Sequence, residues 1–219
     1  DAGTAVITMA TGTSIDAGTG MVTIRLDDGT GNTNTAAGDI TLGGITADSI
    51  FVQTSNTASD IRLGDGALIT ASGAGDAIVL ASADDFRNDS GTGAPFELSG
   101  GGRWLIYSGN PADNSLGDLS GDFNRYSCDY VLGCVAGVSL PTSGNGLIYR
   151  YTPMLSITGI SIADKAYDGT TDATMSGAGV LSGLLAGDTA TLDGSGGTAA
   201  GADKNAGTGK TVNLSGSFT

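Results

Sequence analysis

The side chains in this sequence that could act as an acid, a base or a cation ligand are almost all carboxylates. Asp and Glu together number 23, Glu97 is the single Glu, and His is absent. A glycosidase needs two carboxylates at a defined separation, and the best adjacent pairs are Asp27-Asp28 and Asp84-Asp85. Both pairs stand where a predicted strand ends, which favours turn formation and capping. We therefore predict that the chain is not an enzyme, with cleavage or binding of polysaccharide by a β-helix as an alternative.

Cation binding is a second chemistry that carboxylates support. Asp, Asn and backbone carbonyls are natural Ca²⁺ ligands, and Asn110, Asp113, Asn114 and Asp118 lie together in one polar stretch. The EF-hand pattern and the Gly-rich nonapeptide that binds Ca²⁺ are both missing. The absence of His also removes the commonest ligand of transition metals. We expect a solvated loop and no cofactor, with calcium as the one candidate.

Cys128 and Cys134 are the only cysteines and lie six positions apart. Two thiolates without His rarely complete a zinc shell, so a disulfide is favoured over a metal site. Closing so short a loop stabilises the fold by about 2 kcal/mol in the chain-entropy model. An extracellular setting would favour the disulfide. The alternative is a pair of reduced, partly buried thiols.

Charge limits the partners of this chain. Lys and Arg number nine, and the net charge is −14. A basic patch that follows phosphates is therefore not expected, nor is attraction to anionic lipid. No apolar run approaches the ~20 residues of a membrane helix. We predict other proteins or surface glycans as partners, with no nucleic acid and no membrane insertion.

Short strands separated by turn residues are predicted throughout residues 1–102. A weak repeat links GDITL at 38–42, SDIRL at 59–63 and GDAIVL at 75–80. Its interval of about 20 residues is typical of one solenoid coil. The pattern predicts an all-β chain that begins with a right-handed parallel β-helix, and an antiparallel β-sandwich is the alternative. Gly, at 38 residues, suits tight corners between strands.

An aromatic segment, residues 103–153, follows the repeat. The last coil of a solenoid exposes unpaired backbone groups, so an atypical capping sequence is needed there. We predict that this segment is the C-terminal cap, clasped by the two cysteines. The aromatic residues expected to pack in it are Phe96, Trp104, Tyr107, Phe123, Tyr126 and Tyr130. Residues 154–219 then carry regularly spaced turn signals, which predict a small β domain.

Residues 154–219 also carry a recognisable motif. The stretch KAYDGTT, with Lys165, Tyr167, Asp168 and Gly169, is followed by LAGD and then by ADKNAGTGK, with Asp203 and Lys204. These three pieces resemble, in the same order, the YDG-type repeat of filamentous-haemagglutinin-like adhesins. The preceding stretches RWLIYS and FNRY resemble the segment that ends the β-helical shafts of those proteins.

This resemblance implies a secreted bacterial surface adhesin, exported by two-partner secretion or a related route. Residues 154–219 would then form a β-sandwich-like or β-grasp-like stalk module. The expected function is attachment or cell–cell and biofilm cohesion at the cell surface. The module is shorter than the family pattern, which leaves open an extracellular filament subunit that polymerises by strand exchange.

Overall fold

The computed structural model describes residues 5–26, 38–177, 179–185, 187–193 and 196–217. Every regular element among them is a β-strand, and no helix occurs in these ranges. Contacts divide the chain into two units, Asp1–Pro153 and Met154–Thr219. Each unit is described by itself below.

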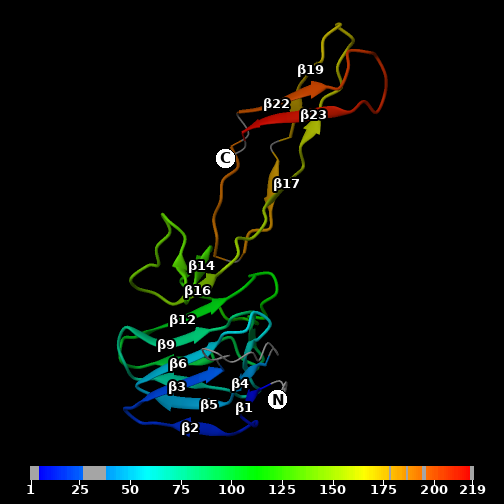
Figure 1. Ribbon diagram of the computed structural model, residues 1–219. Coiled ribbons are helices and arrows are strands. Elements are labelled where there is room, and N and C mark those ends of the chain that lie inside the picture. The colour runs from blue at the N-terminus through cyan, green and yellow to red at the C-terminus, as the bar shows by residue number, and fades with distance from the viewer. Residues whose placement is uncertain (1–4, 27–37, 178, 186, 194–195, 218–219) are drawn as a thin grey trace. The chain divides into compact units, whose positions relative to one another are not determined.

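The first unit is a parallel β-solenoid of about five turns (Figure 1). Each of its first four coils contributes one short strand to each of three sheets. Sheet A holds β1 (Ile7–Thr8), β4 (Ile40–Leu42), β7 (Ile61–Leu63) and β10 (Phe86–Asn88). Sheet B holds β2 (Ser14–Asp16), β5 (Gly44–Ala47), β8 (Ile69–Ala71) and β11 (Phe96–Leu98). Sheet C begins with β3 (Met21–Leu26), β6 (Ser49–Thr54), β9 (Asp76–Ala81) and β12 (Arg103–Ser108). The predicted all-β parallel solenoid is confirmed.

In-register stacking builds the core of the solenoid. Ile61 lies between Ile40 of the preceding coil and Phe86 of the following coil, and none of the three has exposed surface. Alternate residues of each short strand point inward, so every coil adds one or two apolar side chains per sheet. Burying each such side chain contributes about 1.5–3 kcal/mol. The corners bring backbones close together, and a Cβ at Gly100 would collide with the carbonyl of Ser72.

The structure corrects one part of the predicted repeat. Residues 38–42 and 59–63 do stack in sheet A, with Ile40 on Ile61. Residues 76–80 belong instead to β9 of sheet C, and Gly75 immediately precedes this strand. The third member in sheet A is Asp85-Phe86-Arg87, because Phe86 pairs with Ile61. The prediction of the third repeat failed for two reasons. Phe86 stands where the first two repeats have Ile, and the coil between Ile61 and Phe86 is longer than the coil before it.

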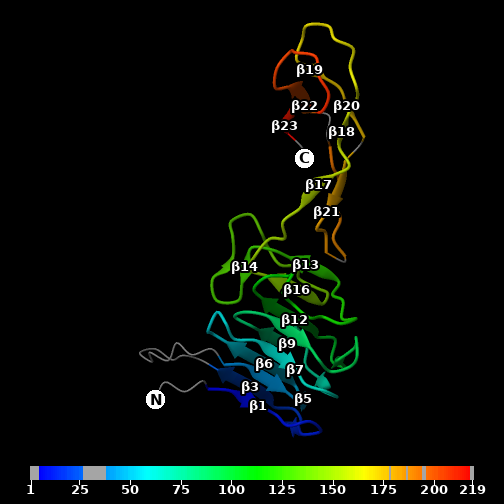
Figure 2. The ribbon, with the colours of Figure 1, turned by 90° about the vertical axis from the view of Figure 1, so that its right-hand side faces the viewer.

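Sheet C continues beyond the fourth coil with two more parallel strands. They are β16 (Gly146–Tyr149), which pairs with β12, and β13 (Phe123–Arg125), which pairs with β16. The later strand in the sequence therefore lies between the two earlier ones, and Figure 2 shows these strands stacked in this order. The predicted boundary at residue 102 falls immediately before β12, which belongs to the fourth coil.

Between β13 and β16 the chain forms a small antiparallel hairpin. Its strands are β14 (Cys128–Asp129) and β15 (Gly133–Cys134). Leu105, Cys128 and Ile148 form a buried cluster at its base, and Tyr107 and Phe123 pack against them. Leu105 and Ile148 come from β12 and β16. The hairpin thus covers part of one face of sheet C.

The second unit consists of three small antiparallel sheets. They pair β17 (Ser156–Thr158) with β21 (Val180–Ser182), β18 (Ser161–Ile162) with β20 (Met175–Ser176), and β19 (Asp172–Ala173) with β22 (Gly196–Gly201), which also pairs with β23 (Val212–Ser217). Among the residues of this unit whose side chains are described, none is fully buried. A sandwich-like or grasp-like core in this unit therefore stays a prediction.

Candidate functional site

One corner of the solenoid gathers the acidic residues that immediately precede sheet A. Asp39, Asp60 and Asp85 stand one residue before β4, β7 and β10, and the strand register stacks them. Two arginines of the same sheet join them. Arg62 contacts Asp39 at 3.2 Å and Asp60 at 2.7 Å, and Arg87 contacts Asp60 at 2.8 Å and Asp85 at 3.1 Å. Each arginine therefore links the carboxylates of two successive coils.

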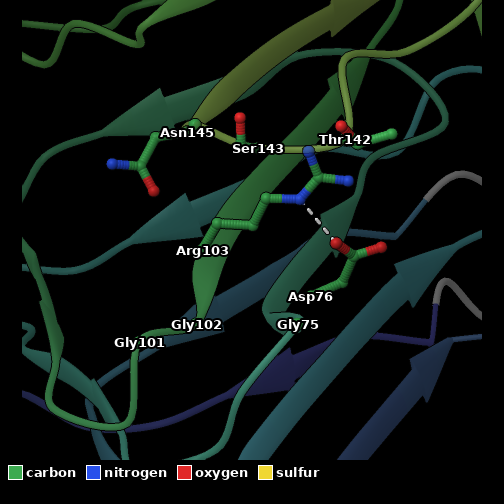
Figure 3. Close-up of a pocket in the computed structure, with 9 residues that line it drawn as sticks. Gly75, Asp76, Gly101, Gly102, Arg103, Thr142, Ser143 and Asn145 are labelled. Atoms are coloured by element: carbon green, nitrogen blue, oxygen red, sulfur yellow. Dashed lines mark hydrogen bonds and ion pairs between the residues drawn. The ribbon is translucent and has the colours of Figure 1, made fainter.

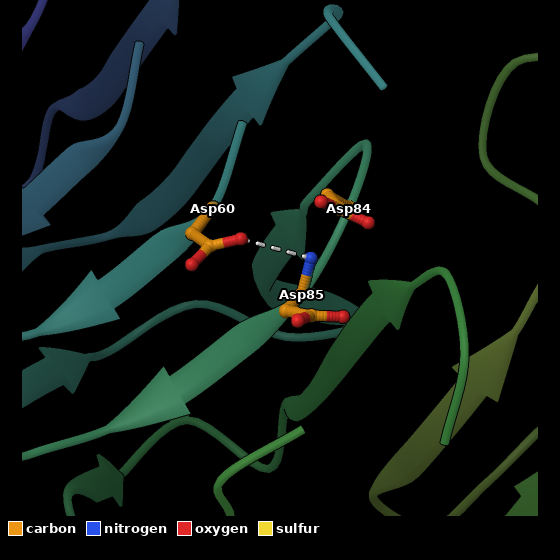
Figure 4. Close-up of side chains that lie close together, drawn as sticks. All are labelled: Asp60, Asp84 and Asp85. Atoms are coloured by element: carbon orange, nitrogen blue, oxygen red, sulfur yellow. Dashed lines mark hydrogen bonds between the residues drawn. The ribbon is translucent and has the colours of Figure 1, made fainter. Parts of the chain in front are cut away.

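Asp84 adds a further carboxylate beside Asp60 and Asp85. Oxygen atoms of Asp60, Asp84 and Asp85 lie within 4.8 Å of one another, and Figure 4 shows the three residues where β7 and β10 begin. Asp60 and Asp85 are buried, at 6% and 7% exposure, and Asp84 is half-buried. We call Asp60, Asp84 and Asp85 the acidic corner. It is the one group of three or more acidic or Cys side chains that converges in this way among the described residues.

The acidic corner is electrostatically unusual. Burial, followed by repulsion from Asp84 and Asp60, raises the pKa of Asp85 to about 6, while Arg87 opposes the shift. Burial and the charge of Asp60 also raise the pKa of Asp84. Removing water from a carboxylate disfavours its charged form, and like charges add to that effect. Perturbed carboxyl groups of this kind mark candidate sites.

The backbone fixes these carboxylates in place. The Asp84 N–H donates to Ser59 O at 3.2 Å, and Gly109 N donates to Asp84 O at 2.6 Å. The Asp85 N–H donates to Asp60 Oδ1 at 3.2 Å. Backbone hydrogen bonds to the coils before and after it therefore hold the corner in place, in addition to the bonds that its carboxylates make.

The predicted carboxylate pairs meet different outcomes. Asp84-Asp85 joins the acidic corner, where Asp60 from the preceding coil is the partner that the sequence did not reveal. The two side chains are not simple turn caps, because one is buried and bonded to Arg87. Asp27-Asp28 lies outside the described residues.

The loop predicted to be solvated, with calcium as the alternative, does not gather its four oxygen-bearing candidates around one point. The Asn114 amide is committed to structure, because its Oδ1 accepts from Phe86 N at 2.6 Å and its Nδ2 donates to Ser108 Oγ at 2.8 Å. Asn110 Nδ2 donates to Asp113 Oδ2 at 2.7 Å. Asp118 packs elsewhere, against Gly93.

The predicted cap aromatics form separate contacts. Phe96 lies against Trp104, with ring centroids 5.3 Å apart, and Tyr126 stacks on Tyr149 at 5.5 Å. Tyr130 contacts Tyr107 at 5.2 Å.

Two further ring contacts involve residues beyond the predicted set. Tyr130 also contacts Phe51 of β6, with centroids 5.2 Å apart, so the hairpin reaches back to the second coil. Phe123 lies over Gly146 in the paired strand and beneath Arg125, whose guanidinium is 5.6 Å from the ring centroid. These rings were expected to close the end of the solenoid, whereas the Tyr130 contacts lie along sheet C.

The outward position of Phe51 could have been found from the sequence. Successive residues of a strand point to opposite faces, so Phe51 lies on the opposite face of β6 from the buried Ile50 and Val52.

Cys128 and Cys134 face each other in register, and the structure pairs their sulfur atoms. Arg150 Nε donates to Asp129 Oδ2 at 2.9 Å, which adds a second tie between the hairpin and the end of β16. The oxidation state of the cysteines in the cell stays a prediction.

A shallow cleft of about 220 Å³ lies where β9 and β12 begin (Figure 3). Arg103 crosses it, donating to Asp76 Oδ1 and to Pro141 O, both at 2.6 Å. Asn145 closes one side by accepting from Trp104 N at 3.0 Å. Arg103 and Asp76 thus bond to each other, and Arg103 also bonds to the backbone. These bonds stabilise the fold at this cleft.

The YDG motif forms a compact turn in the second unit. Lys165 Nζ lies 2.9 Å from Asp168 Oδ1 and donates to Thr170 Oγ1 at 2.7 Å. Asp168 Oδ1 also accepts from Thr170 N at 2.9 Å, and Gly169 has a φ of 77°, which favours glycine. Hydrogen bonding to Lys165 lowers the pKa of Asp168 to about 2. Tyr167 is 68% exposed.

The second half of the motif is held by an ion pair between residues that are not adjacent in the sequence. Asp203 bonds to Lys210, with Nζ 2.6 Å from Oδ2, and accepts from Asn205 N at 2.8 Å. The adjacent Lys204 is exposed. Residues 152–219 match the family described as YDG domain. This match confirms the YDG part of the resemblance, and the solenoid lies outside it.

No curated protein matches the chain, and no solved structure matches it. Kinship with filamentous haemagglutinins therefore stays a prediction. No helix among the described residues is long and apolar enough to cross a membrane.

Proposed function

We propose that this chain is a structural and adhesive segment of a secreted bacterial surface protein. In this proposal it contributes to attachment or to cohesion between cells, without catalysis. The protein would be of the filamentous-haemagglutinin-like kind, exported by two-partner secretion, and would act at the cell surface on other proteins or surface glycans. The observation that carries the proposal is a parallel solenoid followed directly by a segment that matches the YDG domain family.

The arrangement of charged groups supports a structural role. Arg62 and Arg87 are each bonded to two carboxylates, and Arg103 bridges Asp76 and the Pro141 carbonyl. Such bonds link successive coils and give the stack lateral stability. Repetition of short coils makes a solenoid an extended scaffold, since each coil contacts mainly its neighbours.

Display on a non-adherent bacterium tests the proposal. The full chain is fused to an outer-membrane anchor, and cell clumping and retention on protein-coated and glycan-coated surfaces are measured. The control displays the anchor with an unrelated domain of similar size. We expect greater retention or clumping with the chain, and equal values would refute the adhesive role. Release of reducing ends from a polysaccharide would replace the proposal with the enzymatic alternative.

A second candidate function, polymerisation by strand exchange, has one specific observation in its favour. The second unit has no fully buried residue among its described side chains, while Val180 and Leu214 are 64% and 44% exposed. A strand from another molecule would cover such side chains by adding to a sheet edge. Light scattering over a concentration series tests it, with a chain lacking residues 154–219 as the comparison. Polymers that still form from the shortened chain, or a full chain that stays strictly monomeric, would contradict strand exchange.

A further inference from the structure

The acidic corner leaves one buried oxygen without a partner. Asp85 is only 7% exposed, and its Oδ1 is enclosed without any hydrogen bond in the described structure. Its other oxygen, Oδ2, accepts from Arg87. A buried carboxylate oxygen without a partner is costly, because it has lost water and gained nothing in return. Asp85 Oδ1 would lack a partner even if the three carboxylates were not clustered.

The neighbouring carboxylates also keep unused oxygen capacity. No donor among the described residues bonds to the Asp84 carboxylate. Asp60 Oδ1 accepts only from the Asp85 N–H, whereas Asp60 Oδ2 is occupied by Arg62 and Arg87. The arginines therefore occupy Oδ2 of Asp60 and Oδ2 of Asp85, and they contact neither Oδ1 of these residues nor the Asp84 carboxylate. Asp113 adds negative charge nearby, and Arg150 and Arg87 partly oppose it.

We propose that Asp60, Asp84 and Asp85 bind a Ca²⁺ ion. Two oxygens bound to the same Ca²⁺, each at about 2.4 Å, are at most about 4.8 Å apart. The mutual spacing in the corner stays within 4.8 Å, so each pair of carboxylates meets this limit. The bound ion would give Asp85 Oδ1 its missing partner and offset the repulsion among the carboxylates.

Ca²⁺ suits this corner better than a smaller or softer ion. All available ligands are oxygens, and the half-exposed Asp84 leaves room for the waters that complete six to eight ligands. Mg²⁺ demands near-ideal octahedral geometry and gives up its waters reluctantly. Three carboxylates without further protein ligands predict a Kd of about 10⁻⁴–10⁻³ M, the range of weak calcium modules. The ion would join the coils that carry β7 and β10.

Calorimetric titration of the full chain with CaCl₂ tests the proposal, with MgCl₂ titrated in parallel. Asp84→Asn is the key variant, because its carboxylate makes no hydrogen bond on which the fold depends. Asp65→Asn is the matched control, because it removes one exposed charge from a turn elsewhere in the same solenoid. We expect one bound Ca²⁺, at least a tenfold loss of affinity in Asp84→Asn, and a change of less than about twofold in Asp65→Asn.

Three results would overturn the assignment. They are no Ca²⁺ binding up to about 10 mM, equal losses in Asp84→Asn and Asp65→Asn, or tighter binding of Mg²⁺ than of Ca²⁺. Equal losses would indicate diffuse attraction to a chain of net charge −14. As a second readout, Ca²⁺ should raise the urea midpoint of the wild type but not that of Asp84→Asn, because a ligand stabilises only the state that binds it.

Discussion

Replacing Asp85 with Asn should stabilise the solenoid at neutral pH in the absence of divalent cations. The side chain is almost fully buried, and its pKa is raised from the usual 3.8 to about 6. A raised carboxyl pKa means that the folded state holds the proton more tightly than the unfolded chain does. The free energy of unfolding therefore falls as pH rises from about 4 to above 6, where the buried group ionises.

The size of this effect follows from the pKa shift. The pKa rises by about two units, and each unit corresponds to about 1.4 kcal/mol, so ionisation costs about 3 kcal/mol at most. Asn has the shape of the protonated acid and carries no charge. The Asn variant should therefore equal the wild type near pH 4 and exceed it by up to about 3 kcal/mol near pH 8.

Urea unfolding in EDTA measures the difference. Trp104 is the single Trp of the chain and is buried in β12, so its fluorescence reports on the solenoid alone. The midpoint of each transition and its slope give the free energy at each pH. Asp65→Asn, which changes an exposed carboxylate, should show no comparable pH trend. An Asp85→Asn variant that is less stable than the wild type at pH 8 would contradict a raised pKa for Asp85, because Arg87 would then be stabilising a carboxylate of lowered pKa.

Three other changes probe the hairpin, the end of sheet C and the YDG turn. Reduction of the cysteine pair should cost about 2 kcal/mol of unfolding free energy, and thiol counting on the unreduced chain should find no free thiol. Gly146→Val should cost about 1–3 kcal/mol by urea unfolding, because its Cβ would overlap the Phe123 ring, and unchanged stability would contradict the pairing of β13 with β16. Lys165→Met should return the pKa of Asp168 from about 2 toward its usual range in an NMR titration. Since a lowered carboxyl pKa contributes stability that is lost as pH falls through it, the wild-type turn should lose stability between about pH 4 and pH 2, and the variant should show less of this pH dependence.

The solenoid was predictable because one physical requirement repeats in each coil. Ile40 and Ile61 occupy equivalent places, and the alternation around them marks the buried face. Phe86 was missed, because an aromatic side chain fills the same interior column after a longer coil. Coil length is set by loops at the surface, and the interior pattern does not constrain it.

The candidate site was only half predictable from the sequence. The pair Asp84-Asp85 is visible as adjacent letters, but Asp60 joins it only through the parallel register of β7 and β10. The hairpin is similar, because Tyr130 meets Phe51 through tertiary contact across most of sheet C. Such contacts depend on how coils stack, which local sequence does not encode. The YDG turn was accessible, because its bonds lie within a few residues of one another.

The adhesive role is tested most directly in the cells that produce this chain. Attachment under shear is compared between cells with the intact protein and cells whose protein lacks residues 1–219, after surface amounts are shown to be equal. We expect fewer attached cells or smaller clumps without the segment, and restored attachment when the segment is returned. Equal attachment and clumping at equal surface amounts would contradict it.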